Sequence, residues 1–206
     1  DIFIDIGCNY GAYSIPISKS KNQINIYSFD ASKKSLDKLI ENIKLNQVKN
    51  IRYFHLGIGE KEKIVKFDDE TKNFKNSASY RIKNNGEGTK IKLNSIDNLI
   101  KNKIIIANKN IFIKIDIEGY EFYALKGLIE TIKNYNVMIF FEFSKKLEEN
   151  HSNLQFEFNK FITENNLVIK NNNFEDQNID ELFQSLYNLN DDYEVLDNYI
   201  ITKKTR

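Results

Sequence analysis

Short apolar runs alternate with amphipathic stretches along this 206-residue chain. Runs at 2–6, 24–29, 51–56, 111–115 and 137–143 have the length and composition of buried strands. Between the second and third runs, residues 33–45 carry apolar side chains at helical spacing, and Ser32 stands where an N-cap is expected. Later strands are predicted at 167–170 and 199–202. The pattern predicts one α/β domain over 1–206, with a mostly parallel central sheet flanked by helices and an antiparallel strand near the C-terminal edge.

Two stretches break this pattern. Residues 68–89 are polar and weakly periodic, which predicts a lid over a ligand or a surface insertion. Residues 171–197 are acidic and aromatic, and we expect them either to cover a binding pocket or to close the sheet. The chain begins at Asp1, immediately before a predicted strand and without an initiator methionine, so we expect sequence to be missing upstream.

Charge and composition narrow the range of partners. The net charge of +1 gives no overall field that would favour nucleic acid or an anionic membrane. No apolar run is long enough to span a membrane. A single cysteine, Cys8, excludes an internal disulfide framework and favours a reducing, cytoplasmic compartment. We expect Cys8 to fill space beneath a loop rather than to act as a reactive thiol.

The first predicted strand ends in a glycine turn that precedes a helical pattern. Asp5 lies at the strand tip, and Gly7 and Gly11 bracket the turn. A dinucleotide loop would have the pattern G-x-G-x-x-G, but its second and third glycine positions hold Asn9 and Ala12. A side chain at Asn9 prevents close approach of a phosphate, and the Asp5 carboxylate would repel one. The loop therefore favours a zwitterionic or cationic ligand, although a purely structural turn is the alternative.

Acidic residues also follow three later strands. Asp30 ends the second strand about 20 residues beyond the glycine turn, where an acid binds ribose hydroxyls in nucleoside-binding sheets. Asp116, Glu118 and Glu121 surround a glycine after the strand at 111–115. Because like charges repel, we favour a site over simple decoration of a helix N-terminus. Glu142 interrupts an apolar strand and should meet a cation, a hydroxyl group or water.

Three segments carry a family resemblance. DIGCNYG at 5–11, FDASKKSLDKLIENIKLN at 29–46 and KIDIEGYEFYALKG at 114–127 resemble the FkbM family of S-adenosylmethionine-dependent methyltransferases. The resemblance covers residues 1–143. Cys8 stands where an alanine is usual, Asp30 replaces a glutamate, and Ala31 replaces a proline. The resemblance implies a class I, Rossmann-like methyltransferase fold that transfers a methyl group, usually to a hydroxyl oxygen.

The resemblance also assigns roles to residues. Asp116 is expected to lie near the methyl group as the first catalytic candidate, with Glu142 second and with Glu118 and Glu121 on the acceptor side. No metal is predicted, because no histidine or cysteine cluster accompanies these acids. The residues expected to bind S-adenosylmethionine are Asp5, Gly7, Asn9, Gly11, Asp30, Ala31, Leu56, Gly57 and Ile58.

The predicted reaction is O-methylation of a sugar or another small-molecule acceptor, with no nucleic-acid partner. Two alternatives remain open. One is a degenerate methyltransferase fold that serves as a binding module. The other is a nucleotide-binding Rossmann enzyme, against which Asn9 and Ala12 argue.

Overall fold

The computed structural model describes residues 1–20, 23–68, 81–83, 88–145, 147, 153–189 and 195–204. Most of the predicted lid or insertion at 68–89 therefore lies outside the described residues, as do residues 190–194 of the segment 171–197.

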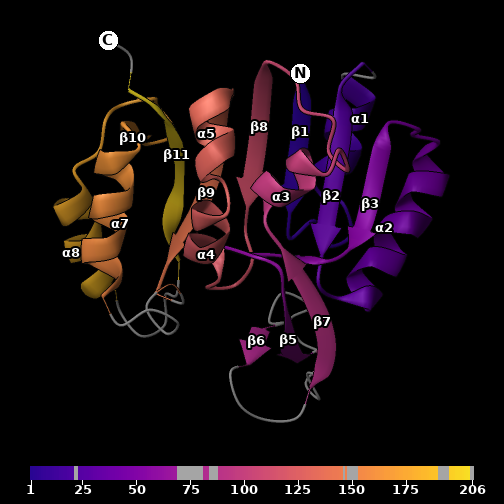
Figure 1. Ribbon diagram of the computed structural model, residues 1–206, viewed down its shortest axis with the longest axis horizontal. Coiled ribbons are helices and arrows are strands. Elements are labelled where there is room, and N and C mark those ends of the chain that lie inside the picture. The colour runs from indigo at the N-terminus through magenta and orange to yellow at the C-terminus, as the bar shows by residue number, and fades with distance from the viewer. Residues whose placement is uncertain are drawn as a thin grey trace.

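Seven strands form the central sheet in the order β10-β11-β9-β8-β1-β2-β3 (Figure 1). Their bounds are Ile2–Ile6 (β1), Asn25–Asp30 (β2), Ile51–His55 (β3), Asn110–Ile115 (β8), Asn136–Ser144 (β9), Leu167–Lys170 (β10) and Val195–Lys203 (β11). Within this order, the neighbouring strands β9-β8-β1-β2-β3 pair in parallel. The strand β11 is antiparallel to both of its neighbours, β9 and β10. This confirms the predicted mostly parallel sheet with an antiparallel strand near the C-terminal edge.

The order of the strands reverses at β1, which pairs with β2 on one side and with the much later β8 on the other. In this register Asp5 lies between Ser28 of β2 and Lys114 of β8. A reversal of this kind opens a crevice beyond the carboxyl ends of the strands, where α/β proteins place their ligands.

The helices are Ser14–Ser20 (α1), Lys33–Asn46 (α2), Ile96–Lys101 (α3), Glu121–Lys126 (α4), Ile129–Asn134 (α5), Leu154–Glu164 (α7) and Ile179–Tyr187 (α8). Ser32 caps α2 as predicted, because its side chain accepts a hydrogen bond from the Ser35 N–H. Apolar residues recur at helical spacing over 122–132, and the structure divides this stretch between two helices, α4 and α5. Gly127 stands at the break, where a Cβ would lie 2.3 Å from the Gly59 carbonyl oxygen. In the described part of the chain, no helix has the length and apolar character needed to cross a membrane.

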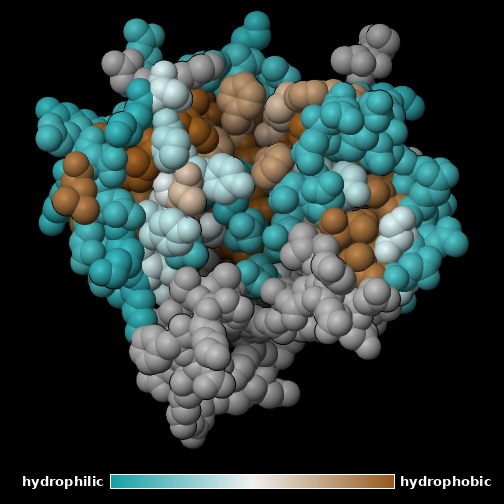
Figure 2. Space-filling view, turned by 180° about the vertical axis from the view of Figure 1, so that it is seen from behind, coloured by the Kyte–Doolittle hydropathy of each residue, from teal (hydrophilic) through white to brown (hydrophobic). Residues whose placement is uncertain are grey.

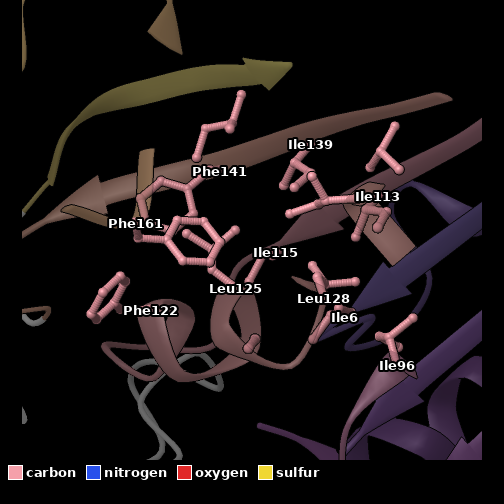
Figure 3. Packing of buried hydrophobic residues seen from close by; sticks show 14 of the residues in the cluster. Ile6, Ile96, Ile113, Ile115, Phe122, Leu125, Leu128, Ile139, Phe141 and Phe161 are labelled. Carbon is pink, nitrogen blue, oxygen red and sulfur yellow. The ribbon is translucent and has the colours of Figure 1, made fainter. Parts of the chain in front are cut away.

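Side chains on the two faces of the sheet form separate cores. Ile4 and Ile6 of β1 belong to the larger core, together with β8, β9 and the helices α4 and α5. Figure 3 shows Leu125 and Leu128 lying over Ile113 and Ile115 in this core. On the opposite face, residues of β1 and β2 pack against α1 and α2 in the second core. Because successive side chains of a strand point to opposite faces, the two helical layers lie on opposite sides of the sheet.

The face of β8 and β9 that is turned away from α4 and α5 is apolar, but in the described part of the chain it is only partly covered. Phe112 is 38% exposed, and Met138 and Phe140 are half-buried. Figure 2 shows hydrophobic surface in the middle of this face, between hydrophilic regions. The ring of Phe140 lies 6.4 Å from that of Tyr13, which belongs to the connection from the glycine turn to α1.

A smaller sheet lies beyond the carboxyl ends of β1 and β2 (Figure 1). It contains Gly57–Ile58 (β4), Lys63–Asp68 (β5), Arg81–Lys83 (β6) and Thr89–Asn94 (β7), in the order β4-β7-β5-β6. One of its faces buries Phe67, Ile91 and Leu93 against Tyr120, which precedes α4. The small sheet therefore forms a wall beside the crevice of the main sheet.

Candidate active site

A cavity of about 320 Å³ lies at the carboxyl ends of β1, β2 and β8. Of the residues predicted to form the site, all except Asp5, Gly11 and Glu121 line this cavity. A larger surface depression, of about 990 Å³, runs along α7 and α8, but none of the predicted site residues lies in it. The acids that follow separate strands are thus gathered in one place.

Gly7 allows the first loop to lie directly against the tip of β8. Its φ is +76°, and a Cβ would lie 1.9 Å from the carbonyl oxygen of Asp116. The N–H groups of Gly7 and Cys8 both donate to the Phe29 carbonyl, at 2.9 and 3.1 Å. Only glycine satisfies both the positive φ and this close approach.

Asp30 holds the same loop from the side of β2. The backbone N–H of Asn9, a residue with φ of +47°, donates to Asp30 Oδ2 at 2.8 Å. The Ser32 N–H donates to Asp30 Oδ1, also at 2.8 Å. Burial raises the pKa of Asp30, although these two hydrogen bonds oppose the change. Each carboxylate oxygen has a further lone pair, so Asp30 keeps acceptor capacity toward the cavity that it lines.

The wall formed with the small sheet is apolar. Leu56, Ile58, Phe67 and Tyr120 line the cavity on this side. Gly57 brings the backbone close to β7, because a Cβ there would lie 2.3 Å from Leu93 Cδ2. An apolar wall beside a few fixed polar groups suits a flat heteroaromatic ring.

Gly11 contributes to the loop without lining the cavity. Its φ is +92°, and a Cβ would lie 2.5 Å from Leu39 Cδ1 of α2. Its carbonyl accepts a hydrogen bond from the Ile15 N–H at 3.0 Å. Gly11 thus allows α1 to begin in close contact with α2, so its effect on a ligand would be indirect.

Asp5 lies below the cavity and has no exposed surface. The Ser14 hydroxyl donates to Asp5 Oδ2 at 2.6 Å and is hydrogen-bonded to Ser28 at 2.8 Å. Asp5 Oδ1 has no hydrogen-bond partner and lies 3.8 Å from the Lys114 Nζ atom. Burial raises the pKa of Asp5 even though Lys114 opposes the change. Asp5 therefore lies beneath the cavity without lining it, and the direct ligand contact expected from the sequence stays a prediction.

Lys114 is a site residue that the sequence analysis missed. Its side chain is 7% exposed, and its ammonium donates to the Gly7 carbonyl at 3.1 Å. Nζ also lies 3.1 Å from Asp116 Oδ2 and 5.0 Å from the centre of the Tyr13 ring. Burial lowers the pKa of Lys114, but Asp5 and Asp116 outweigh it and hold this pKa above its usual value. A lysine within an apolar strand, two residues before an acid, was the available signal.

The loop after β8 presents Asp116 and Glu118 to the cavity. Glu121 is fully buried and does not line it. Its Oε1 accepts hydrogen bonds from the N–H groups of Ile117 and Gly119, at 2.9 and 3.1 Å. Burial raises the pKa of Glu121 to about 7, and its Oε2 has no hydrogen-bond partner. This placement makes Glu121 the residue that shapes the loop, and it does not support the acceptor contact expected from the sequence.

Glu142 lines the cavity from β9 and is half-buried. It follows Phe141, the register partner of Ile115, so Glu142 within β9 lies beside Asp116, which follows the last residue of β8. Two carboxylates on neighbouring strands provide hydrogen-bond acceptors for hydroxyl groups. Among the described residues, no group of three or more histidine, cysteine, aspartate or glutamate side chains has the arrangement of a metal site.

Comparisons with known proteins identify the fold and the family of this chain. The fold is that of the Rossmann-like methyltransferases. The sequence matches the family described as "Methyltransferase FkbM domain" over residues 5–193, so the chain belongs to the FkbM methyltransferase family. Comparison with curated proteins gives no match.

Solved structures show the likeness of fold. A protein from Clostridium thermocellum, assigned as an rRNA methylase, is 9% identical with a TM-score of 0.55, over 100% of this chain and 87% of that one. A protein from Streptococcus mutans, assigned as a methyltransferase and solved with SAH (S-adenosylhomocysteine), is 11% identical with a TM-score of 0.50, over 98% and 88%. Coclaurine N-methyltransferase is 10% identical with a TM-score of 0.37, and the match covers 69% of this chain and 31% of that enzyme.

Proposed function

We propose that this chain transfers a methyl group from S-adenosylmethionine to a hydroxyl oxygen of a sugar or another small molecule. The observation that carries the proposal is that Asp30 and Asp116, from the ends of β2 and β8, line one cavity beside Gly7. Membership of the FkbM methyltransferase family supports it.

The residues of the cavity fit this cofactor. S-adenosylmethionine has an adenine ring, a ribose diol, an ammonium and a sulfonium, and it has no phosphate. Asp30 offers carboxylate oxygens to a diol, and the wall that contains Leu56, Gly57 and Ile58 offers apolar contact to a ring. Acidic side chains elsewhere in the lining suit a positively charged ligand. The Streptococcus mutans protein, which has the same fold, was solved in complex with SAH.

S-adenosylmethionine, when bound, would supply a methyl group attached to a positively charged sulfur, and loss of the methyl group would leave this sulfur as a neutral thioether. Asp116 orients the acceptor hydroxyl and takes up its proton as the new carbon–oxygen bond forms. Glu142 holds a second hydroxyl of the acceptor from the neighbouring strand. Most of the rate acceleration then comes from alignment of the acceptor oxygen with the methyl group.

The alternatives differ in what the chain binds. A nucleotide-binding Rossmann enzyme would bind NAD in preference to S-adenosylmethionine, and a binding module without catalysis would transfer no methyl group. Nucleic acid is not favoured as an acceptor by the net charge of +1. The cytoplasmic location expected from the single cysteine stays a prediction.

Isothermal titration with S-adenosylmethionine, S-adenosylhomocysteine and NAD tests the cofactor. We expect the first two to bind and NAD not to bind. A screen of glycan and small-molecule hydroxyl acceptors with radiolabelled S-adenosylmethionine then tests transfer. The variant Asp116→Ala should still bind S-adenosylhomocysteine and lose transfer, whereas Asp37→Ala, on the exposed face of α2, should retain both. Full turnover by Asp116→Ala would refute the catalytic role given to this residue.

A further inference from the structure

The cavity has an unequal charge balance. Four carboxylates line it, from Asp30, Asp116, Glu118 and Glu142. Among the described residues of the lining, Lys114 is the single cation. A lining of this kind attracts positively charged ligands.

Under the proposed function, on which this inference rests, such attraction has a disadvantage. The sulfur of the methyl donor is positively charged before transfer and neutral afterwards. Carboxylates that stabilise the positive charge of the bound donor lose part of that interaction as the charge disperses in the transition state. Stabilisation that is stronger in the ground state than in the transition state slows the chemical step. A fixed positive charge within the acidic cluster would reduce this effect.

Lys114 lies where it can have this effect. Its Nζ is 3.1 Å from Asp116 Oδ2 on the exposed side and 3.8 Å from Asp5 Oδ1 on the buried side. The same ammonium donates to the carbonyl of Gly7 at 3.1 Å, and both Gly7 and Asp116 line the cavity. A lysine that is 7% exposed is stable only with such partners, so its position is fixed by Asp5 and Asp116.

We propose that Lys114 is a positioning residue that fixes Asp116 against the Gly7 loop and limits the preference of the cavity for a positively charged sulfur ligand over a neutral one. Removal of this charge should strengthen binding of S-adenosylmethionine relative to S-adenosylhomocysteine. Removal of the Asp116 charge should have the opposite effect.

The test compares the dissociation constants of S-adenosylmethionine and S-adenosylhomocysteine, measured by isothermal titration with the full chain. The measured quantity is the preference, defined as the Kd of S-adenosylhomocysteine divided by that of S-adenosylmethionine. Lys114→Gln keeps a donor for the Gly7 carbonyl and should raise the preference by roughly fivefold or more. Asp116→Asn should lower it by a similar factor. Lys114→Arg keeps the charge and should stay within about twofold of the unmodified chain.

Lys133→Gln is the matched control, because Lys133 is exposed on α5 and pairs with Glu130. It changes the total charge equally and should leave the preference unaltered. Equal changes in both dissociation constants for Lys114→Gln would overturn the proposal, since a purely structural lysine would weaken both ligands together.

Asp116→Asn decides the question even if Lys114→Gln does not fold, because the Asp116 side chain is 38% exposed and tolerates an isosteric change. An unchanged preference in Asp116→Asn would overturn the inference. Failure of the unmodified chain to bind either ligand would instead count against the proposed function.

Discussion

The backbone N–H of Asn9 donates a hydrogen bond to Asp30 Oδ2 at 2.8 Å, which ties the loop after β1 to the end of β2. The sequence predicts that Asp30 binds a ribose, and in the structure its carboxylate also accepts hydrogen bonds from the backbone of neighbouring segments. The same carboxylate accepts the Ser32 N–H, so it also holds the residue that caps α2. Loop, strand end and helix start are therefore fixed by one side chain.

Asp30→Ala should weaken binding of S-adenosylhomocysteine by about 10- to 100-fold, because a hydrogen bond to a charged group contributes about 1.5–3 kcal/mol. It should also lower the free energy of unfolding by about 1–3 kcal/mol, since two N–H groups lose their acceptor. Isothermal titration and urea unfolding measure the two effects. Asp37→Ala, on the exposed face of α2, is the control. Unchanged affinity in Asp30→Ala would remove Asp30 from the binding site.

Gly7→Ala should distort the contact between the tips of β1 and β8. The added Cβ would lie 1.9 Å from the Asp116 carbonyl oxygen in a backbone conformation of φ +76°, so the backbone must move. We expect the melting temperature to fall by about 5–15 °C and cofactor affinity to be lost. At Gly59, a Cβ would meet two side chains and no backbone atom, with the edge of the Tyr120 ring at 3.1 Å and Leu93 Cδ1 at 3.5 Å. Gly59→Ala should therefore have a smaller effect, and equal melting temperatures for the two variants would contradict this account.

Much of this site could be predicted because its chemistry is local in sequence. Strand, glycine turn and helix follow one another around Gly7, and Asp30 and Asp116 come directly after apolar runs. Parallel strands bring their carboxyl ends to one edge, so residues at those ends meet without any knowledge of the tertiary contacts. That β5 and β7 form a second sheet was not predicted, because both strands are rich in lysine and bury few apolar side chains, namely Phe67, Ile91 and Leu93.

Depth within the site could not be predicted, because it depends on which neighbour covers each residue. Asp5 and Asp30 are both acids at strand ends, but Asp5 lies between Ser28 and Lys114 in the middle of the sheet and is fully buried. Glu121 and Glu118 are three residues apart, yet the turn at Gly119 directs one inward and the other to the cavity. Lys114 was missed because its role exists only through Asp5 and Asp116.

Cys8 should be unreactive in the folded protein. Its side chain is 3% exposed, and burial raises the pKa of its thiol well above the usual value, so the nucleophilic thiolate is scarce. Iodoacetamide at pH 8 should leave the native chain unmodified over a period in which the urea-unfolded chain is fully alkylated. Intact-mass spectrometry measures the added mass. Rapid alkylation of the native chain would show that the loop after β1 opens in solution.

Glu121→Gln should remove a pH dependence from stability. The pKa of Glu121 is about 7 when the carboxyl is buried and about 4.5 when it is free, so the folded state binds more protons between these values. The Glu121 contribution to stability is thus most favourable at low pH and declines as pH rises from about 5 through 7. Relative to Glu121→Gln, the unmodified chain should lose about 2–3 kcal/mol of unfolding free energy between pH 5 and pH 8.

The comparison of slopes isolates this carboxyl group, because Asp5, Asp30 and the other titrating residues are common to both chains. The side-chain amide oxygen that Glu121→Gln introduces would still accept the N–H groups of Ile117 and Gly119. The loop that presents Asp116 should therefore keep its shape, and cofactor affinity should be preserved at pH 8. Urea unfolding at several pH values provides the slopes. Parallel slopes for the two chains would mean that Glu121 is ionised at pH 5 and that its burial is compensated by contacts other than these two hydrogen bonds.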